Sequence, residues 1–170
     1  QADIVEDRFP AEHFELVHAR AVLQHLPARR DVVTKLVGLL KPGGWLILED
    51  GHFGLFAEQP LPEPYQTMHR IIASASRDEW RDPSVGAHLL AWMAEEELTD
   101  LDLVGDVWAM RPGEDGGDWW FLALERAGPM LVEAGVLTTE QVDESLAQVS
   151  EPGFVMVSTT SIAVLGRRPN

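Results

Sequence analysis

Three side chains suited to acid–base chemistry follow one apolar segment of the chain. The segment WLIL, residues 45–48, leads directly to Glu49 and Asp50, and His52 stands two residues further on. Ligands of open α/β sheets bind beyond the carboxyl ends of the strands, so a strand here would place these groups at a ligand site. His52 is the best general base by residue type, because unperturbed histidine has a pKa of about 6.5. The alternatives are a solvent-exposed loop histidine, and an Asp50 that orients the loop.

A second group of polar residues follows another short apolar segment, FELVHA, residues 14–19. Arg20 comes directly after it, where a strand of a parallel sheet would meet a ligand. The alternative is that Arg20 pairs with a nearby carboxylate such as Asp50. His25, in the sequence LQHLP, is a candidate contact for substrate or cofactor. A lone histidine after a helical turn is otherwise a packing or capping residue.

A helical pattern joins these two segments. In RRDVVTKLVGLL, residues 29–40, apolar side chains recur with the helical period. Lys41 is expected in the last turn, where a cation suits the helix dipole, and Pro42-Gly43-Gly44 ends the helix. WLILED is apolar almost throughout, which is typical of a strand covered on both faces. Strand, helix and strand within about 37 residues predict a βαβ unit with a right-handed crossover.

The rest of the chain alternates helical and extended patterns. Residues 51–64 are rich in glycine and proline and predict a long connection. The further predicted elements are helices at 64–80 and 82–98, a strand at 101–111, a turn at 112–118, a helix at 119–135 that Pro129 kinks or breaks, a helix begun by a capping box of Thr138 with Gln141, and a strand at 154–168.

Several large side chains recur at helical spacing, and they could either line a pocket or pack in a core. We interpret most of them as core, since methionine and tryptophan at this spacing usually pack inside; they are Tyr65, Met68, His69, Trp80, Trp92 and Trp108. Trp119, Trp120 and Phe121 are consecutive, so they cannot all point into one core. At least one of them is expected to be partly exposed, as part of an interface or pocket wall.

Composition and charge exclude several classes of function. The chain has 170 residues, of which 45% are hydrophobic, as expected for one globular domain. Its net charge of −15, from 13 basic and 28 acidic residues, argues against nucleic-acid binding and favours a small neutral or cationic partner. The absence of cysteine excludes disulfides and thiolate–metal sites. No His/Asp/Glu spacing predicts a metal site, and no Ser-His-Asp arrangement stands out.

The sequence offers no signal for a membrane. No apolar run approaches the roughly 18 residues that span a bilayer, and the start QADIVEDRFP does not resemble a secretory signal. A cytoplasmic location is therefore expected.

With these elements placed, the segment FELVHARAVLQHLPARRDVVTKLVGLLKPGGWLILED closely resembles the second half of class I S-adenosylmethionine-dependent methyltransferases. In that family a phrase like F-D-L-V-x-x-R-x-V-L-x-H-L forms the fourth strand and its loop. A phrase like L-K-P-G-G-x-L-x-x-x-D/E forms the turn into the fifth strand. Both occur here in order and at the usual separation. The match is specific over residues 1–50 and looser over 51–170.

The resemblance implies an α/β fold: a partial Rossmann-like, doubly wound sheet with a helical lid and a closing antiparallel hairpin. The strand 154–168 would lie antiparallel beside WLILED, and 101–111 would form the far edge. The implied domains are 1–58 for the C-terminal half of the cofactor core, 59–99 for the helical lid and substrate region, and 100–170 for the closing hairpin. A helical insertion at 112–150 resembles the branch of the family that acts on small molecules in bacteria.

The resemblance also implies S-adenosyl-L-methionine as cofactor and assigns four residues to it. Asp3 would accept a hydrogen bond from the adenine amino group, and Ile4 would pack on the ring. The carbonyl of Ala19 would face the cofactor's amino group, with Arg20 near the methionine end or the substrate. For Asp3 and Ile4 the alternative is a solvated terminus.

One part of the family pattern has no counterpart in the sequence. The family binds the cofactor with a Gly-rich turn after its first strand and an acid at the end of its second. No such Gly-x-Gly-x-Gly turn follows a predicted strand here. We therefore expect the chain to be a C-terminal fragment, inactive alone. A nicotinamide-dependent Rossmann enzyme is disfavoured for the same reason.

The leading hypothesis is therefore methyl transfer from S-adenosylmethionine to a small molecule by the intact protein, with His52 or His25 as candidate catalytic residues. Such a transfer needs alignment of donor and acceptor more than strong acid–base help. The alternative is a non-catalytic half-fold that serves as an interaction or dimerisation module. In either case FELVHA would form an exposed apolar sheet edge, through which a homodimer is expected.

Overall fold

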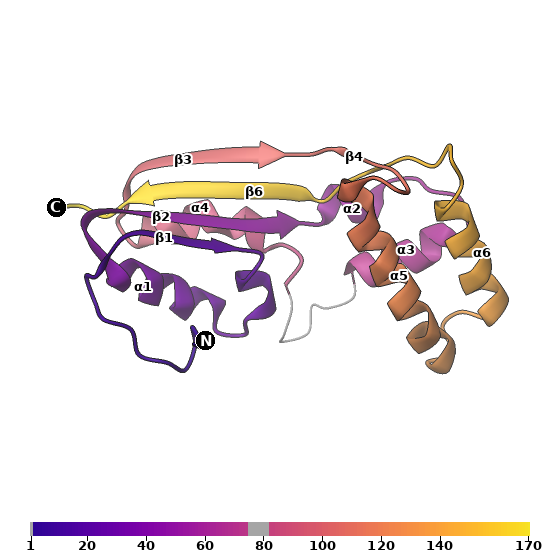
Figure 1. Cartoon of the computed structure of the whole chain (residues 1–170), viewed down its shortest axis with the longest axis horizontal. Helices are drawn as coiled ribbons and strands as arrows, with labels where there is room; N and C mark the ends of the chain where they lie inside the picture. The colour runs from indigo at the N-terminus through magenta and orange to yellow at the C-terminus, as the bar shows by residue number, and fades with distance from the viewer. Residues whose placement is uncertain (1, 75–81) are drawn as a thin grey trace. The chain divides into compact units, whose positions relative to one another are not determined.

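The computed structural model of the chain describes residues 2–74 and 82–170, and these form two compact units (Figure 1). Unit 1 comprises the described residues of Gln1–His52, Ser76–Asp106 and Thr160–Asn170, and unit 2 comprises those of Phe53–Ala75 and Val107–Thr159. The region 59–99 is thus shared between the units, because helix α3 (Tyr65–Ser74) lies in unit 2 and helix α4 (Val85–Glu95) in unit 1.

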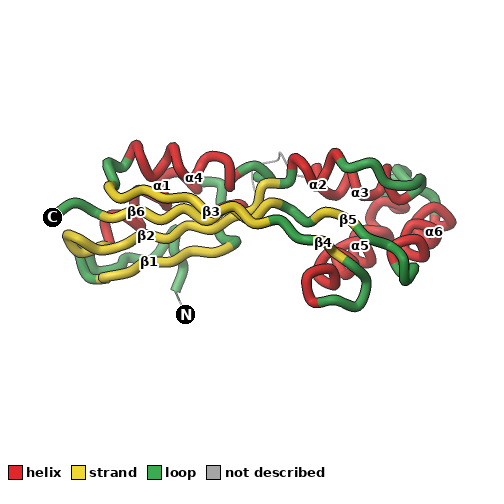
Figure 2. The backbone as a smooth tube through the Cα atoms, turned by 90° about the horizontal axis from the view of Figure 1, so that it is seen from above, coloured by secondary structure: helices red, strands yellow, loops and turns green. Residues whose placement is uncertain are grey.

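Unit 1 is built on a four-stranded sheet with the order β1-β2-β6-β3 (Figure 2). Strand β1 pairs parallel with β2, while β6 pairs antiparallel with both β2 and β3. The prediction that the last strand inserts beside WLILED, with the 101–111 segment at the far edge, is confirmed. The elements of unit 1 are β1 (Phe14–Arg20), the 3-10 turn η1 (Leu23–His25), α1 (Arg29–Leu39), β2 (Leu40–His52), α4 (Val85–Glu95), β3 (Thr99–Asp106) and β6 (Thr160–Arg167).

The core of unit 1 lies between one face of this sheet and the helices α1 and α4. Leu46 and Leu48 of β2 are fully buried and join residues of both helices in one cluster. The alternate residues Trp45 and Ile47 point to the opposite face and are only partly buried. Within the described part of unit 1, therefore, helices cover one face of β2, whereas the sequence suggested that both would be covered.

The helix α1 ends earlier than expected, and β2 begins at once. Because α1 stops at Leu39, Lys41 is not in its last turn; the Lys41 ammonium instead pairs with the Glu15 carboxylate at 3.0 Å. The turn through Gly43 has a positive φ of 76°, which glycine adopts without strain. It aligns the strand so that the Gly43 N–H donates to the carbonyl of Arg168.

Two predicted long strands are each divided in the structure. The segment 101–111 forms β3 and, after a gap, β4 (Ala109–Met110), and 154–168 forms β5 (Met156–Val157) and β6. Strands β4 and β5 pair with each other in unit 2. At the second gap, the Ser158 hydroxyl accepts the N–H of Trp108 and donates to the Thr159 carbonyl. These side-chain bonds compete with regular ladder pairing there.

Unit 2 packs four helices around an aromatic core. Phe56 and Trp120 are the centre of this core, with exposures of 0% and 1% and their rings 4.6 Å apart. The short helix at Phe56 was expected to be an irregular connection. The helices of unit 2 are α2 (Gly54–Glu58), α3 (Tyr65–Ser74), α5 (Asp115–Glu133) and α6 (Thr139–Val149).

A chain of hydrogen bonds satisfies the polar groups buried in this core. The Trp120 indole N–H donates to the Tyr65 hydroxyl over 3.1 Å, and that hydroxyl lies 3.3 Å from Nδ1 of His69. His69 Nε2 lies 2.5 Å from the Phe56 carbonyl, which can only accept, so Nε2 carries the proton and Nδ1 accepts from Tyr65. Burial lowers the pKa of His69 and raises that of Tyr65. The interpretation as core is confirmed for Tyr65, Met68 and His69, whereas Trp92 and Trp108 are only partly buried against the core of their unit. Trp80 and the end of the predicted 64–80 helix lie outside the described residues.

The predicted helices at 119–135 and after Thr138 are present with small changes. Helix α5 begins at Asp115 and continues through Pro129. The capping box of Thr138 with Gln141 is confirmed, since each side chain bonds the other residue's backbone. Of the three consecutive aromatic residues, Trp120 is buried and Trp119 is 41% exposed, as the sequence predicted.

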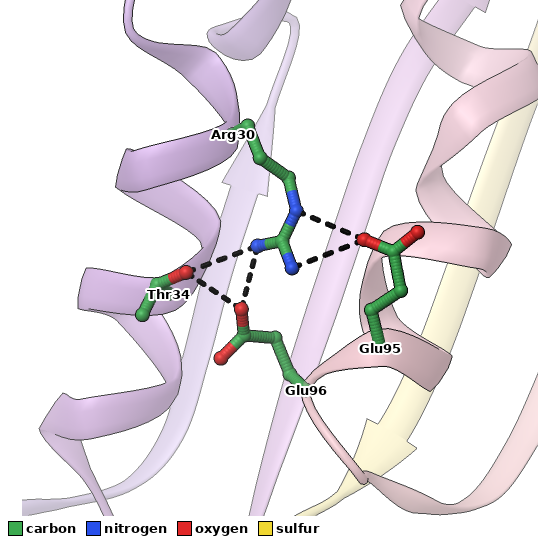
Figure 3. A network of polar contacts seen from close by, with 4 residues as sticks. All are labelled: Arg30, Thr34, Glu95 and Glu96. Carbon is green, nitrogen blue, oxygen red and sulfur yellow. Dashed lines mark hydrogen bonds and ion pairs between the residues drawn. The ribbon is translucent and has the colours of Figure 1, made fainter.

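A network of charged side chains joins α1 to the end of α4 (Figure 3). The Arg30 guanidinium contacts the carboxylates of Glu95 at 3.1 Å and Glu96 at 2.5 Å. The Thr34 hydroxyl also donates to Glu96, over 2.6 Å. The Glu96 side chain is 15% exposed and that of Glu95 is 59% exposed. Burial alone would raise the pKa of Glu96, but the bonds from Thr34 and Arg30 hold it below 4.5.

Glu96→Gln is expected to lower the free energy of unfolding by about 1–3 kcal/mol at neutral pH, because a charge-assisted bond in a sheltered position is lost. Glu95→Gln is the matched control and should cost at most about 0.5 kcal/mol, as for exposed ion pairs. Since the folded-state pKa of Glu96 is depressed, its contribution is present above pH 4.5 and is lost as the pH falls through the folded-state pKa. Urea unfolding followed by circular dichroism measures both variants; equal losses, or a Glu96→Gln deficit unchanged in acid, would contradict the assignment.

Candidate functional site

The carboxyl ends of β1 and β2 lie side by side and bring the two groups of candidate residues together. In the parallel register, Ala19 pairs with Leu48 and Arg20 with Glu49. The Arg20 guanidinium contacts the Glu49 carboxylate at 3.1 Å. The same Glu49 oxygen accepts a hydrogen bond from the Ser161 hydroxyl at 2.9 Å. This edge of the sheet therefore holds a linked set of polar groups from β1, β2 and β6.

The partner of Arg20 is Glu49 and not Asp50, which the sequence suggested as one possibility. Side chains of a strand alternate between its faces, so Glu49 and Asp50 point in opposite directions. Glu49 shares the face of Arg20, whereas Asp50 lies on the helix-covered face and is 3% exposed. The Arg20 side chain remains 71% exposed, so it can still meet a ligand.

Asp50 holds the loop that follows β1. Its carboxylate accepts the backbone N–H of Gln24 and that of Gly51, each over 3.1 Å. The Gln24 carbonyl in turn accepts the N–H of Asp82 over 2.8 Å, which joins the loop to the segment before α4. Burial raises the pKa of Asp50, although these backbone bonds act in the opposite direction. The interpretation of Asp50 as a loop-orienting residue is confirmed.

Two residues at this edge were not identified from the sequence. Ala21 has a φ of 51°, which is uncommon for alanine, and its N–H donates to the Glu49 carbonyl over 2.9 Å. Gly86 brings α4 against the end of β2: a Cβ there would lie 2.9 Å from the Asp50 carbonyl oxygen. Nothing in the sequence indicates the positive φ of Ala21. A glycine at position 86, near the start of a helix, indicates a close backbone contact only once the end of β2 is known to pack there.

An apolar pocket of about 390 Å³ lies beside β1 in unit 1. Ile4, Ala19 and Arg20, three of the four residues assigned to the cofactor, line this pocket together. Other walls come from Phe9 and from the α1 residue Leu36. Of its lining residues, His18 and Arg20 carry the ionisable side chains. The size and the apolar walls are those of a site for a small organic ligand, with Arg20 as a polar anchor.

The fourth assigned residue, Asp3, adjoins this pocket through its neighbour Ile4 and has backbone partners. Its carboxylate accepts the N–H groups of Val5 at 2.7 Å and Glu6 at 3.2 Å. These two bonds lower the pKa of Asp3, and the bond from Glu6 has the larger effect. The carboxylate thus organises the turn on which Ile4 is carried.

The two candidate catalytic histidines are not among the lining residues of this pocket. His52 is the last residue of β2, is half-buried, and pairs in register with Thr160. His25 is exposed in η1 and lies close enough for its charge to act on Asp50. In the described part of the chain, no group of three or more His, Asp and Glu side chains could hold a metal ion. None of the described helices is long and apolar enough to cross a membrane.

Residues 1–48 match the sequence model of a family described as the Methyltransferase domain. The chain is 43% identical over 96 residues to Methyltransferase str2 of Strobilurus tenacellus, and the aligned part covers 55% of this chain and 34% of that protein. The chain thus spans about a third of the length of this curated relative.

Two solved structures resemble the fold of the whole chain. The YcgJ protein of Bacillus subtilis aligns with a TM-score of 0.57 at 15% identity, over 100% of this chain and 70% of that one. A candidate methyltransferase of Bacillus halodurans C-125 aligns with a TM-score of 0.50 at 18% identity, over 100% and 76%. At these identities the structures establish the fold alone. The resemblance to methyltransferases is confirmed over residues 1–48, and the Rossmann-like α/β fold that it implied is confirmed by these structures.

Asp50→Ala is expected to reduce the free energy of unfolding by about 1–3 kcal/mol, because the buried N–H groups that it accepts are left unpaired. Asp50→Asn keeps one acceptor oxygen and should cost less. Since burial raises the folded-state pKa of Asp50 above 3.8, its effect on stability is most favourable below pH 3.8 and is lost as the pH rises through the folded-state pKa. Chemical unfolding between acid and neutral pH measures this difference; an Asp50→Asn variant with the same pH dependence as the parent chain would contradict it.

Proposed function

We propose that the protein containing this chain transfers a methyl group from S-adenosylmethionine to a small molecule. The observation that carries the proposal is the convergence of Ile4, Ala19 and Arg20 on one apolar pocket that extends along β1 and includes its carboxyl end. When bound, S-adenosylmethionine would supply an electrophilic methyl group on a sulfonium. The match of residues 1–48 to a methyltransferase domain supports this reaction class.

The residues of the pocket fit the adenine end of such a cofactor. Ile4 offers an apolar surface for a planar ring, and Ala19 leaves space because its side chain is small. The pocket volume lies within the range of about 300–1,000 Å³ typical of small-molecule sites. Arg20 would face the cofactor's methionine end or the methyl acceptor, with Glu49 holding the guanidinium in place.

We further propose that this chain supplies only part of the cofactor site. Among the described residues no Gly-x-Gly-x-Gly turn follows a strand. Such a turn allows the backbone to approach the ligand closely, and a distinct segment of the intact protein would provide it. The short coverage of the curated relative supports this division.

In this proposal His52 takes a proton from the accepting atom of the substrate, and His25 is the second candidate. His52 stands at the carboxyl end of β2, where open sheets present their catalytic groups. Methyl transfer is an in-line displacement, so the main task of the site is to align donor and acceptor. A cytoplasmic, bacterial enzyme remains our expectation, although the relative str2 comes from Strobilurus tenacellus.

Ile4→Asp is expected to weaken S-adenosylmethionine binding by the intact protein about tenfold or more, because a charge enters an apolar contact with the ring. Val5→Asp is the matched control: the side chain is adjacent in sequence, 38% exposed and not among the lining residues, so binding should be unchanged. Calorimetric titration measures both, with thermal unfolding of each variant to confirm folding. Equal weakening by the two variants would contradict the assignment of the pocket.

The division of the site has its own test. The 170-residue chain alone should show no calorimetric signal with S-adenosylmethionine. Micromolar binding by this chain would contradict the shared site while leaving methyl transfer open.

A second candidate function, a non-catalytic module that dimerises, is favoured by the free edge of β1. Strand β1 has one neighbour in the sheet of unit 1, and its side chains Phe14 and Leu16 are 36% and 55% exposed. An apolar edge strand is a template for pairing with another chain. We propose a homodimer through this edge for the 170-residue chain.

Leu16→Lys is expected to convert such a dimer into a monomer, because an edge lysine opposes strand pairing. Val104→Lys is the control: Val104 is 59% exposed on β3, at the other edge of the same sheet. Light scattering coupled to size exclusion measures the mass of each. A monomeric parent chain, or a dimer lost equally with Val104→Lys, would exclude pairing at β1.

A further inference from the structure

A groove lies between α5 and α6 in unit 2. Its volume is about 430 Å³, and its lining residues come from these two helices alone. The helices approach closely at Gly128, where an added Cβ would lie 2.6 Å from Cγ1 of Val142. This contact brings the two backbones together and leaves a furrow along their junction. The floor of the furrow is apolar and consists of Pro129, Val132, Val142 and Leu146.

The edges of this groove carry negative charge. Glu125, Glu133 and Asp143 line it together with the Thr139 hydroxyl, and none of its lining residues is basic. Within the described residues, no ion pair engages any of the three carboxylates. Unit 2 has eleven acidic residues against three arginines in its sequence, so the surrounding field is negative as well.

Pro129 lies inside α5 and lines the groove. Proline has no N–H, so it cannot donate the helical hydrogen bond that the carbonyl of Glu125 would receive from this position. The Glu125 carboxylate and those of Glu133 and Asp143 thus stand beside an apolar floor. Such a set of acceptors favours a ligand that brings N–H donors and positive charge.

The lining positions have the spacing of a helix–helix contact. Pro129 and Val132 on α5, and Val142 and Leu146 on α6, recur at three or four residues, so each helix presents one continuous row. Two parallel rows of this kind receive the side chains of a third helix at i, i+3 or i+4, and i+7. A small molecule would be enclosed on one side only, whereas a helix would cover the groove along its length.

We propose that this groove binds a basic amphipathic helix of a partner protein. Apolar side chains of that helix would occupy the floor, and its lysines or arginines would meet Glu125, Glu133 and Asp143. A second copy of this chain does not offer such a helix in its described residues. Its most basic helix, α1, buries its apolar side chains in the core of unit 1, and its Arg30 is already paired with Glu96. The proposal does not depend on methyl transfer.

The test uses the full chain and a fluorescein-labelled peptide of about 18 residues, with leucines at helical spacing and lysines elsewhere. Fluorescence anisotropy at about 0.15 M salt should show saturable binding that a glutamate–leucine peptide does not reproduce. Pro129→Lys should weaken binding about tenfold or more, because it places a cation in the groove. The helix itself should be preserved, since lysine is a far better helix former than proline. Circular dichroism checks this.

Glu144→Lys is the matched control, because Glu144 is exposed on α6 but does not line the groove. Glu144→Lys changes the net charge by two units and Pro129→Lys by one, so a purely non-specific attraction would be weakened at least as much by the control. Binding should stay within about twofold of the parent chain. Equal weakening by both variants, or no binding of the basic peptide, would overturn the proposal. The proposal would also be overturned if octylamine bound and Pro129→Lys weakened that binding while the peptide did not bind. That outcome would indicate a small cationic ligand. A dimer that Pro129→Lys dissociates would instead indicate a second copy.

Discussion

Strand β2 is paired on both edges, with β1 in parallel and β6 in antiparallel register, and its two-residue side-chain period determines which groups are buried. Leu46, Leu48 and Asp50 fall on the face that α1 and α4 cover, and Glu49 falls on the other. The burial of Asp50 makes its carboxylate available to the backbone of the loop after β1. The exposure of Glu49 makes its carboxylate available to Arg20. The alternation of side chains along β2 thus places the structural carboxylate of Asp50 on one face and the carboxylate of Glu49, which can meet a ligand, on the other.

The pocket beside β1 follows from the same arrangement. Because β1 is an edge strand, the apolar side chains beside it are packed on one side by α1 and by the turn that Asp3 organises. The remaining side stays open, and the open space has apolar walls with Arg20 as its charged group. The pocket extends along β1 to its carboxyl end, where open α/β sheets bind their ligands. The same open edge is also what would permit association with another strand.

Unit 2 contains two sets of polar groups, one hydrogen-bonded inside its core and one at the surface groove. Inside the core, Trp120, Tyr65 and His69 satisfy one another, and a closed network of this kind fixes a unique packing. At the surface between α5 and α6, the carboxylates form no ion pair among the described residues, and the groove floor below them combines the exposed Pro129 with partly buried and buried side chains. The first arrangement stabilises the fold by itself, whereas the second is the place where we propose that a basic helix binds.

The sequence by itself determined the elements whose pattern is local: the βαβ unit, the capping box at Thr138, the core positions of Tyr65 and Met68, and the family resemblance of residues 14–50. Local periodicity and turn chemistry suffice for these, because neighbouring residues decide them. Tertiary structure alone decided that Arg20 pairs with Glu49, that Gly86 meets the end of β2, and that the 154–168 segment is divided at Ser158. It also decided that helices cover one face of β2 within unit 1 and that a groove opens beside Pro129. Each of these depends on residues distant in sequence, whose approach is set by strand register and helix packing and not by any local pattern.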